Sequence, residues 1–359
     1  MRTWMSRSAV TLLVLLLTVT GCGKNTGNNG TAGTREPAGG TGTTAGTEGG
    51  TGNQAGAKFN IGMVTDVGGV NDNSFNQSAW EGLQLLEKDT GAKVKYLQSK
   101  SDAEYLPNLN QMVKGNFNMT WGIGFIIGDA MKTVASQNPN AKLAIIDNVV
   151  DAPNVASITF AENEGSFLVG VVAGLMTKTN KIGFVGGIDI PVIKRFEAGF
   201  RAGVTAVNPQ AKLTVNYTGA FDKPDLGKAA AATLYNDGSD IIFHASGATG
   251  NGVFNEAKDR VKSGQKVWVI GVDQDQSKTF GDDVTLTSMM KRVDQAVYRV
   301  SNDLIAGKYE GGKTTVLGLK DDGVGLPETS TKNVPADVLK KVDEYKQRII
   351  SGEIKVPEQ

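Results

Sequence analysis

The chain has 359 residues, equal numbers of acidic and basic side chains, and a single cysteine, Cys22. The balanced charge leaves no basic surplus that would attract a nucleic acid. One cysteine cannot close a disulfide within the chain, so a folded core must rest on apolar burial. The part from residue 58 onward has about 300 residues, which favours two domains.

Residues 1–21 are typical of a secretory signal. Arg2 and Arg7 precede an apolar run over 9–19, and a glycine stands before Cys22. The run is too short to stay in a bilayer as a spanning helix. The sequence Val-Thr-Gly-Cys at 19–22 resembles the lipobox of bacterial lipoproteins, which implies that Cys22 carries acyl chains such as palmitate. We therefore expect a lipid anchor on the extracytoplasmic face of the cell membrane. The alternative is an ordinary signal peptide with a chance cysteine.

Residues 22–57 are predicted to form a flexible linker. After Cys22 they are mostly Gly, Thr, Asn and Ala. Such a segment has too little apolar surface to offset the entropy of ordering it. A flexible chain of this length reaches roughly 30–35 Å, enough to hold a folded body clear of the lipid headgroups.

From residue 58 onward, short apolar runs alternate with amphipathic helical patterns. Buried strands are predicted over 59–64, 93–97, 124–127, 143–146, 155–160, 181–185, 212–217, 241–243, 266–270 and 286–289. Helices are predicted over 74–88, 164–177, 226–236, 253–263, 293–306 and 336–351. This alternation indicates an α/β protein with parallel sheets flanked by helices, and about ten strands suit two such sheets better than one.

Polar residues follow several of these strands. A ligand of an open parallel sheet binds beyond the carboxyl ends of the strands, and Asp66, Asp147 and Asp273 each stand close behind one. A glycine-rich loop containing Gly247 follows another. Acceptors without basic neighbours suit a ligand rich in O–H and N–H donors, such as a sugar or a nucleoside, and do not suit a phosphate. The loop 65–77 is equally explained as a well-capped turn into a helix.

Five segments, taken in order, resemble the basic membrane protein family: 66–77, 160–170, 243–250, 270–275 and 287–291. Members of this family are lipid-anchored substrate-binding proteins of ABC transporters, and they include purine nucleoside receptors. The resemblance implies a two-lobed periplasmic-binding-protein fold of the sugar-binding type (type I) with three hinge crossovers. The first lobe would hold 58–160 and 284–318, and the second would hold 161–283 and 319–359.

The resemblance also implies a nucleoside site between the lobes. Phe75 and Phe221 would sandwich the base, because stacking on an aromatic ring stabilises a bound base by about 1–3 kcal/mol. Asp66 would accept a hydrogen bond from a ring or exocyclic N–H of the base. Either phenylalanine is alternatively a buried structural residue.

The same resemblance assigns the ribose hydroxyls to Asp147, Asp273 and Lys291, and a close approach of the backbone to Gly247. Lys291 is alternatively a structural counter-charge for the carboxylates. Further matching positions, whose role as contacts or as helix caps stays open, are Asn73, Ser74 and Asn76.

An enzyme is the main competing hypothesis. The single histidine, His244, has Ser246 only two residues away, which does not suit a supported catalytic triad, and the clusters that hold metals are lacking. We therefore expect no catalytic residue, no metal and no cofactor. The alternative within the same fold is a sensor or surface lipoprotein that binds another small polar ligand such as a sugar. The predicted partners are a purine nucleoside, the permease and ATPase subunits of an ABC transporter, and the membrane, with no nucleic acid, and a monomer is expected.

Overall fold

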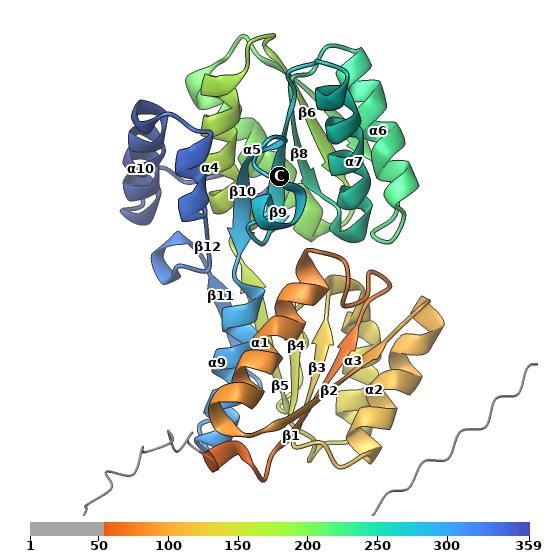
Figure 1. The fold of residues 1–359 in the computed structure, drawn as a ribbon. Helices are drawn as coiled ribbons and strands as arrows, with labels where there is room; N and C mark the ends of the chain where they lie inside the picture. The colour runs from red at the N-terminus through yellow and green to blue at the C-terminus, as the bar shows by residue number, and fades with distance from the viewer. Residues whose placement is uncertain (1–53) are drawn as a thin grey trace, which may run out of the picture. The chain divides into compact units, whose positions relative to one another are not determined.

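A computed structural model describes residues 54–359 of the chain (Figure 1). The predicted signal peptide, Cys22 and the predicted linker as far as residue 53 lie outside the described residues. The described part folds into two lobes, each a 6-stranded sheet with helices on both faces. The predicted α/β class with two largely parallel sheets is therefore confirmed. No helix within residues 54–359 combines the length and the apolar character needed to cross a membrane.

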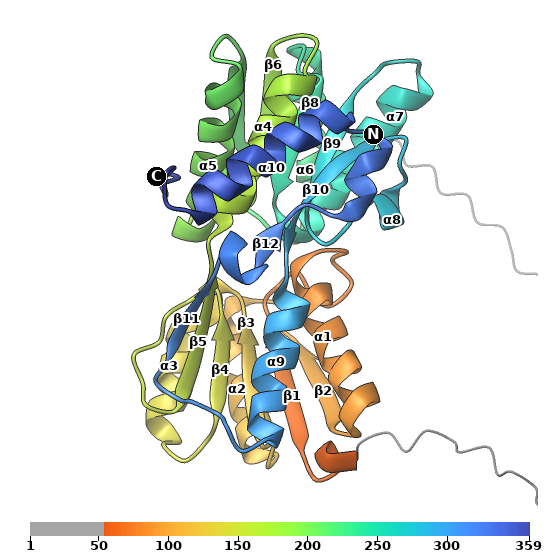
Figure 2. The ribbon, with the colours of Figure 1, turned by 90° about the vertical axis from the view of Figure 1, so that its left-hand side faces the viewer.

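The first lobe has the strand order β11-β5-β4-β3-β1-β2, with every neighbouring pair parallel. Its strands are β1 (Asn60–Thr65), β2 (Lys93–Gln98), β3 (Met119–Ile123), β4 (Leu143–Ile146), β5 (Val155–Phe160) and β11 (Thr314–Leu317). Its helices are α1 (Phe75–Thr90), α2 (Tyr105–Lys114), α3 (Gly128–Gln137) and α9 (Val293–Ile305). Because side chains alternate along a strand, Met63 packs with Leu83 of α1 while Val64 packs with Leu109 of α2. The sheet thus separates the pair α1 and α9 from the pair α2 and α3 (Figure 2).

The second lobe repeats this arrangement with the order β12-β10-β9-β8-β6-β7, in which only β12 runs antiparallel to its neighbour. Its strands are β6 (Lys181–Gly186), β7 (Lys212–Tyr217), β8 (Ile241–Ala245), β9 (Trp268–Asp273), β10 (Thr285–Lys291) and β12 (Val324–Gly325). Its helices are α4 (Glu162–Met176), α5 (Pro191–Val207), α6 (Pro224–Asn236), α7 (Gly250–Lys262), α8 (Ser277–Phe280) and α10 (Ala336–Ile350). Phe243 packs on the side of α4 and α5, and Ile242 packs on the side of α6 and α7.

The chain crosses between the lobes after β5, after β10 and after β11, in agreement with three hinge crossovers. The predicted crossover at residue 284 is wrong, because β10 pairs with β9 in the second sheet and the chain leaves that sheet only after Lys291. The apolar pattern of β10 suits an inner strand of either sheet, so the pattern alone does not choose between them. The folded body also begins before residue 58: Gln54–Gly56 form a 3₁₀ turn, and the carbonyl of Gly56 accepts from the N–H of Phe59.

Most predicted elements match the structure to within a few residues, and three strands (β4, β5 and β7) match at both ends. The strand predicted over 124–127 is wrong. The strand is Met119–Ile123, and Phe125–Ile127 form a 3₁₀ turn because Gly124 breaks the extended backbone with φ of 117°. The sequence pattern does not predict four helices and two strands of the structure: α2, α3, α5, α8, β11 and β12.

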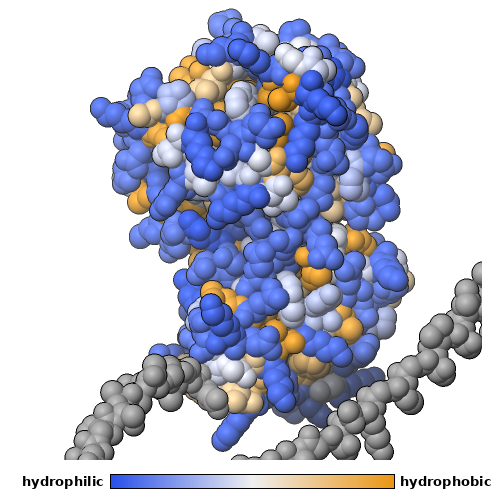
Figure 3. All heavy atoms as spheres, in the orientation of Figure 1, coloured by the Kyte–Doolittle hydropathy of each residue, from blue (hydrophilic) through white to orange (hydrophobic). Residues whose placement is uncertain are grey.

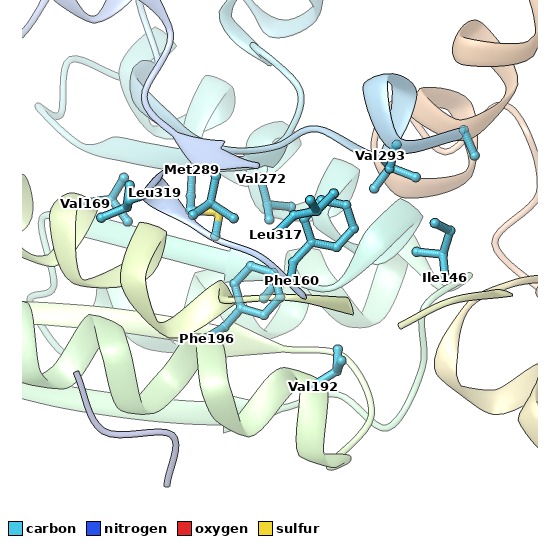
Figure 4. Close-up of a cluster of buried hydrophobic side chains, with 14 of the residues drawn as sticks. Ile146, Phe160, Val169, Val192, Phe196, Val272, Met289, Val293, Leu317 and Leu319 are labelled. Atoms are coloured by element: carbon cyan, nitrogen blue, oxygen red, sulfur yellow. The ribbon is translucent and has the colours of Figure 1, made fainter. Parts of the chain in front are cut away.

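A single apolar cluster runs from the α1 face of the first lobe, through the crossovers, to the α4 and α5 face of the second. Figure 4 shows its part near the crossovers, where Phe160, Phe196, Val272 and Leu317 lie together. By contrast, the surface seen in Figure 3 is mostly hydrophilic, with scattered apolar groups of the kind usual on soluble domains. The main apolar cluster lies inside the fold, and it reaches the space between the lobes.

Helices α4 and α5 approach each other closely at three glycines. A Cβ atom on Gly203 would lie 2.0 Å from the carbonyl oxygen of Phe167, and one on Gly199 would lie 2.1 Å from that of Asn163. A Cβ atom on Gly170 would lie 2.4 Å from the carbonyl oxygen of Phe200. These obstacles are backbone atoms, so a side chain could be accommodated only if the helices moved apart.

We expect Gly203→Ala to destabilise the protein by at least about 1–3 kcal/mol, because the added methyl group overpacks this contact. The measurement is the free energy of unfolding in urea. The matched control is Gly325→Ala, since a Cβ atom there would meet nothing within 4 Å, and it should leave stability unchanged. Equal midpoints for the two variants would contradict the close-packing argument.

Candidate ligand-binding site

A cavity of about 60 Å³ lies between the lobes, at the carboxyl ends of strands from both sheets. We call it the central cavity. It is lined by all seven residues that the sequence analysis named as candidate contacts: Asp66, Phe75, Asp147, Phe221, Gly247, Asp273 and Lys291.

The two candidate aromatic residues reach the central cavity from opposite lobes. Phe75 is the first residue of α1, and Phe221 lies in the turn between β7 and α6. The ring of Phe221 has room because position 187 is a glycine: a Cβ atom there would lie 2.3 Å from the ring. Gly247, with φ of 55°, packs beside Phe221, and its Cβ atom would lie 3.3 Å from the Phe221 carbonyl oxygen. Both half-buried rings therefore offer apolar surface to a ligand.

The start of α1 is capped by a buried carboxylate, Asp72. Its Oδ1 accepts from the backbone N–H of Ser74 at 2.9 Å and of Gln77 at 3.1 Å. Its Oδ2 accepts from the N–H of Asn76 at 2.9 Å. Three otherwise unpaired N–H groups of the first turn are thus satisfied by one side chain. The sequence alone did not show which polar residue caps α1, and the structure shows that Asp72 does so.

Asp66 stands on the cavity wall of the first lobe. Its Oδ1 accepts from the N–H of Gly68 at 2.9 Å and from Nδ2 of Asn76 at 2.8 Å. Burial raises the pKa of Asp66 to about 7, and these two hydrogen bonds oppose that rise. Near neutral pH the carboxyl group is therefore able to act either as an acceptor or, when protonated, as a donor.

Asn76 presents a fixed acceptor beside Asp66. Its Nδ2 donates to Asp66 and, at 3.1 Å, to Asp72, so its Oδ1 is left as the acceptor. This oxygen is buried and has no hydrogen-bond partner among the described residues, and the side chain lines the central cavity. A buried acceptor of this kind is costly unless a ligand or water donates to it. The structure therefore places Asn76 on the cavity wall rather than in a capping role.

Lys291 ends β10 beneath the cavity and is only 1% exposed. Its Nζ lies 2.6 Å from Asp147 Oδ2 and 3.0 Å from Glu162 Oε1, and Glu162 in turn pairs with Arg195 at 2.7 Å. Burial disfavours the charged ammonium, but the surrounding carboxylates of Asp147, Glu162 and Asp273 outweigh burial and raise the pKa of Lys291. The lysine is therefore charged, and most of its charge is balanced within the protein.

Asp147 and Asp273 occupy matching places in the two lobes. Asp147 directly follows β4 and has φ of 70°, and Asp273 is the last residue of β9 and has φ of 64°. Such a backbone is uncommon for a residue other than glycine, although Asp and Asn adopt it more readily than most. The carboxylate of Asp273 accepts from the hydroxyl of Ser74 in the other lobe, and burial raises the pKa of Asp273 to about 7. Asp147 keeps its Oδ1 without a hydrogen-bond partner among the described residues.

The central cavity thus combines apolar walls with acceptors whose positions are fixed. Its charge suits a neutral ligand, because an anion would meet three carboxyl groups and a cation would meet a charged lysine. Sequence reasoning missed several members of the site. Glu162 lies within a segment quoted for the family resemblance, but nothing in its pattern shows that it turns inward to Lys291. The apolar liners Val192, Ile193 and Phe196 come from α5, which was not predicted as a helix.

We expect Lys291→Met to destabilise the unliganded protein by about 3–5 kcal/mol, because Asp147 and Glu162 would be left buried with an uncompensated charge. Thermal or urea unfolding measures the change. Lys313→Met is the matched control, since Lys313 forms an exposed ion pair with Glu310 and should cost at most about 1 kcal/mol. A similar loss in both variants would show that the buried network does not depend on Lys291.

The fold and the enclosed cavity define a substrate-binding protein with two lobes, and comparison with known proteins agrees. The family described as "ABC transporter substrate-binding protein PnrA-like" (Bmp) matches residues 59–359, and the chain belongs to this family. Proteins of this family are extracytoplasmic and membrane-associated, and they serve ABC transporters. The resemblance to the basic membrane protein family is confirmed.

Three relatives illustrate the match. The chain is 51% identical over 317 residues to a "CD4+ T-cell-stimulating antigen" of Listeria monocytogenes, covering 84% of this chain and 88% of that one. It is 41% identical over 311 residues to the "ABC transporter nucleoside-binding protein BmpA" of Lactococcus lactis, covering 82% and 88%. The crystal structure of a solute-binding protein of an ABC transporter system from Aeropyrum pernix superposes with a TM-score of 0.77 at 30% identity, covering 84% of this chain and 94% of that one.

Proposed function

We propose that this protein binds a purine nucleoside in the central cavity and delivers it to an ABC permease. The observation that carries the proposal is the placement of Phe75 and Phe221, from opposite lobes, on the wall of one cavity that also holds fixed acceptors. The Lactococcus lactis relative is named a nucleoside-binding protein, which supports the same ligand class.

The aromatic pair suits the base of such a ligand. A purine has two apolar faces and would lie between the rings of Phe75 and Phe221 when the lobes close. Its edge carries N–H groups, which would donate to Asp66 and to Oδ1 of Asn76. Stacking tolerates any base, whereas the two acceptors respond to the pattern of donors on the edge. The phenylalanines would thus recognise nucleosides in general, and Asp66 and Asn76 would discriminate between bases.

The second group of polar residues suits the ribose. Asp147 and Asp273 would accept from hydroxyl groups, and Lys291 would donate to one of their oxygens. Gly247 would allow the backbone to approach. A nucleoside is neutral and fits this charge balance, whereas a nucleotide would bring a phosphate close to Asp147 and Asp273, beside the ribose. We therefore assign the site to nucleosides and not to nucleotides.

We expect calorimetry on the full chain in detergent to show binding of guanosine, adenosine or inosine, and none of guanosine monophosphate. Phe75→Ala should weaken the binding of every nucleoside by about 1–3 kcal/mol, because one stacking surface is lost regardless of the base. Tyr96→Ala, which removes a partly exposed aromatic residue outside the cavity, should bind as the wild type does. If calorimetry detects binding of a hexose and of no nucleoside, the nucleoside assignment is overturned and the sugar-binding alternative is favoured.

We further propose that Cys22 anchors the receptor through lipid on the outer face of the cell membrane. The anchor would hold the binding body close to its permease and raise its effective concentration there. Cys22→Ala is expected to move the protein from the membrane fraction to the soluble fraction and to reduce nucleoside uptake, with nucleoside affinity unchanged. Fractionation and immunoblotting check this result, and a variant that stays in the membrane fraction would contradict the anchor.

A further inference from the structure

The lobes are joined by a compact set of contacts beside the central cavity. Among residues 54–359, three side-chain hydrogen bonds link the segment 73–81 of the first lobe to the segment 273–276 of the second. The hydroxyl of Ser74 donates to Asp273, Nε2 of Gln274 donates to Glu81 at 3.0 Å, and Nε2 of Gln276 donates to the carbonyl of Asn73 at 2.8 Å. Gln276 is only 1% exposed.

The side chain of Gln276 is fixed in one orientation by its own lobe. Its Oε1 accepts from the backbone N–H of Val272 at 2.9 Å and lies 2.9 Å from Nε2 of His244. Because Nε2 donates to a carbonyl and Oε1 accepts from an amide, the oxygen and nitrogen cannot be interchanged. The donor end of Gln276 is therefore aimed out of the second lobe toward the first.

This orientation also determines the state of His244. Burial lowers the pKa of His244 to about 4, so the ring is neutral near pH 7 and carries one N–H. Since Oε1 of Gln276 is an acceptor, that proton lies on Nε2, and Nδ1 is left to accept from Ser246 Oγ at 3.4 Å. Gly250 closes the other side, because a Cβ atom there would lie 2.1 Å from the ring. Ser246 lines the central cavity, so the chain of contacts runs from the cavity wall to the other lobe.

The partner in the first lobe belongs to the turn that carries the cavity residues. Asn73 has φ of 56°, and its carbonyl meets Gln276, while Ser74 and Phe75 follow it directly. Separation of the lobes would break this hydrogen bond, because its donor and its acceptor belong to different lobes. The contact therefore stabilises only the arrangement in which the two lobes meet.

We propose that Gln276 is a positioning residue that holds the lobes closed over the ligand and couples the wall at Ser246 to the turn at Phe75. The proposal rests on the proposed function as a receptor that closes on its ligand. Gln276 does not line the cavity, so its effect falls on the lifetime of the closed complex rather than on the first encounter with ligand. Gln274 makes an exposed contact across the same gap, where water replaces a lost bond, and it does not have this role.

The test compares Gln276→Met with Gln274→Ala in the full chain. Stopped-flow displacement of guanosine, or of whichever panel ligand binds the wild type, should show release about 3- to 10-fold faster in Gln276→Met, with the association rate changed by less than about twofold. Gln274→Ala should release ligand at about the wild-type rate. Release at the wild-type rate in Gln276→Met, or an equal acceleration in both variants, would overturn the proposal.

Hydrogen exchange without ligand supplies a second readout. Backbone amides at 74–77 bond to Asp72 or lie in its turn and do not touch Gln276, so damage confined to the second lobe would leave them unchanged. We expect these amides to exchange faster in Gln276→Met than in the wild type, and unchanged exchange would overturn the proposal. If Gln276→Met does not fold, Gln276→Glu at pH 8.5 takes its place, because it keeps the acceptor for Val272 and His244 and removes the donor to Asn73. A wild type that binds no nucleoside would refute the proposed function, while the exchange comparison would still decide the role of Gln276.

Discussion

The buried ammonium of Lys291 is the interaction on which the two-lobed structure depends. It ends the last inner strand of the second sheet at the point where the chain crosses to the first lobe. It pairs there with Asp147 from the first lobe and with Glu162, which begins the helix just after an earlier crossover. The charge of Lys291 thereby holds together two crossovers and the floor of the cavity. Because these groups are desolvated, the pairing must be nearly complete, and this condition restricts the positions of the strands and helices that carry them.

The cavity takes its chemical character from that condition. The charge of Lys291 is largely neutralised by protein carboxylates, so the site offers a ligand mainly hydrogen-bond acceptors and aromatic surface. Asp66 and Asp273, whose pKa values burial raises to about 7, can adjust their protonation to the groups that they meet. A site of this kind selects against formal charge on the ligand. It gains specificity from geometry, which the capped turn at Asp72 and the fixed amide of Asn76 provide.

Much of the fold was predictable from the sequence, because strands buried on both faces give short apolar runs that differ clearly from the helices between them. The strands at 143–146 and 155–160 are examples. The prediction was wrong where the pattern is compatible with two outcomes: β10 fits either sheet, and the residues after Gly124 are apolar but form a turn. The seven candidate residues converge on one cavity because the carboxyl ends of parallel strands meet at one edge. The roles of Asn76, Glu162 and Gln276 could not be predicted, since they depend on contacts between residues far apart in sequence.

The two sheets have the same strand order when each is numbered along its own lobe, with a sixth strand added at the same edge by the returning chain. Asp147 and Asp273, in the same unusual backbone conformation, follow or end the fourth strand of each. The two lobes therefore share one topology, apart from the sixth strand, which runs parallel to its neighbour in the first sheet and antiparallel in the second. A ligand between them meets similar strand ends on both sides, so the places where the lobes differ determine its orientation. The fifth strand ends in Phe160 in one lobe and in Lys291 in the other, and of these two equivalent residues only Lys291 lines the cavity.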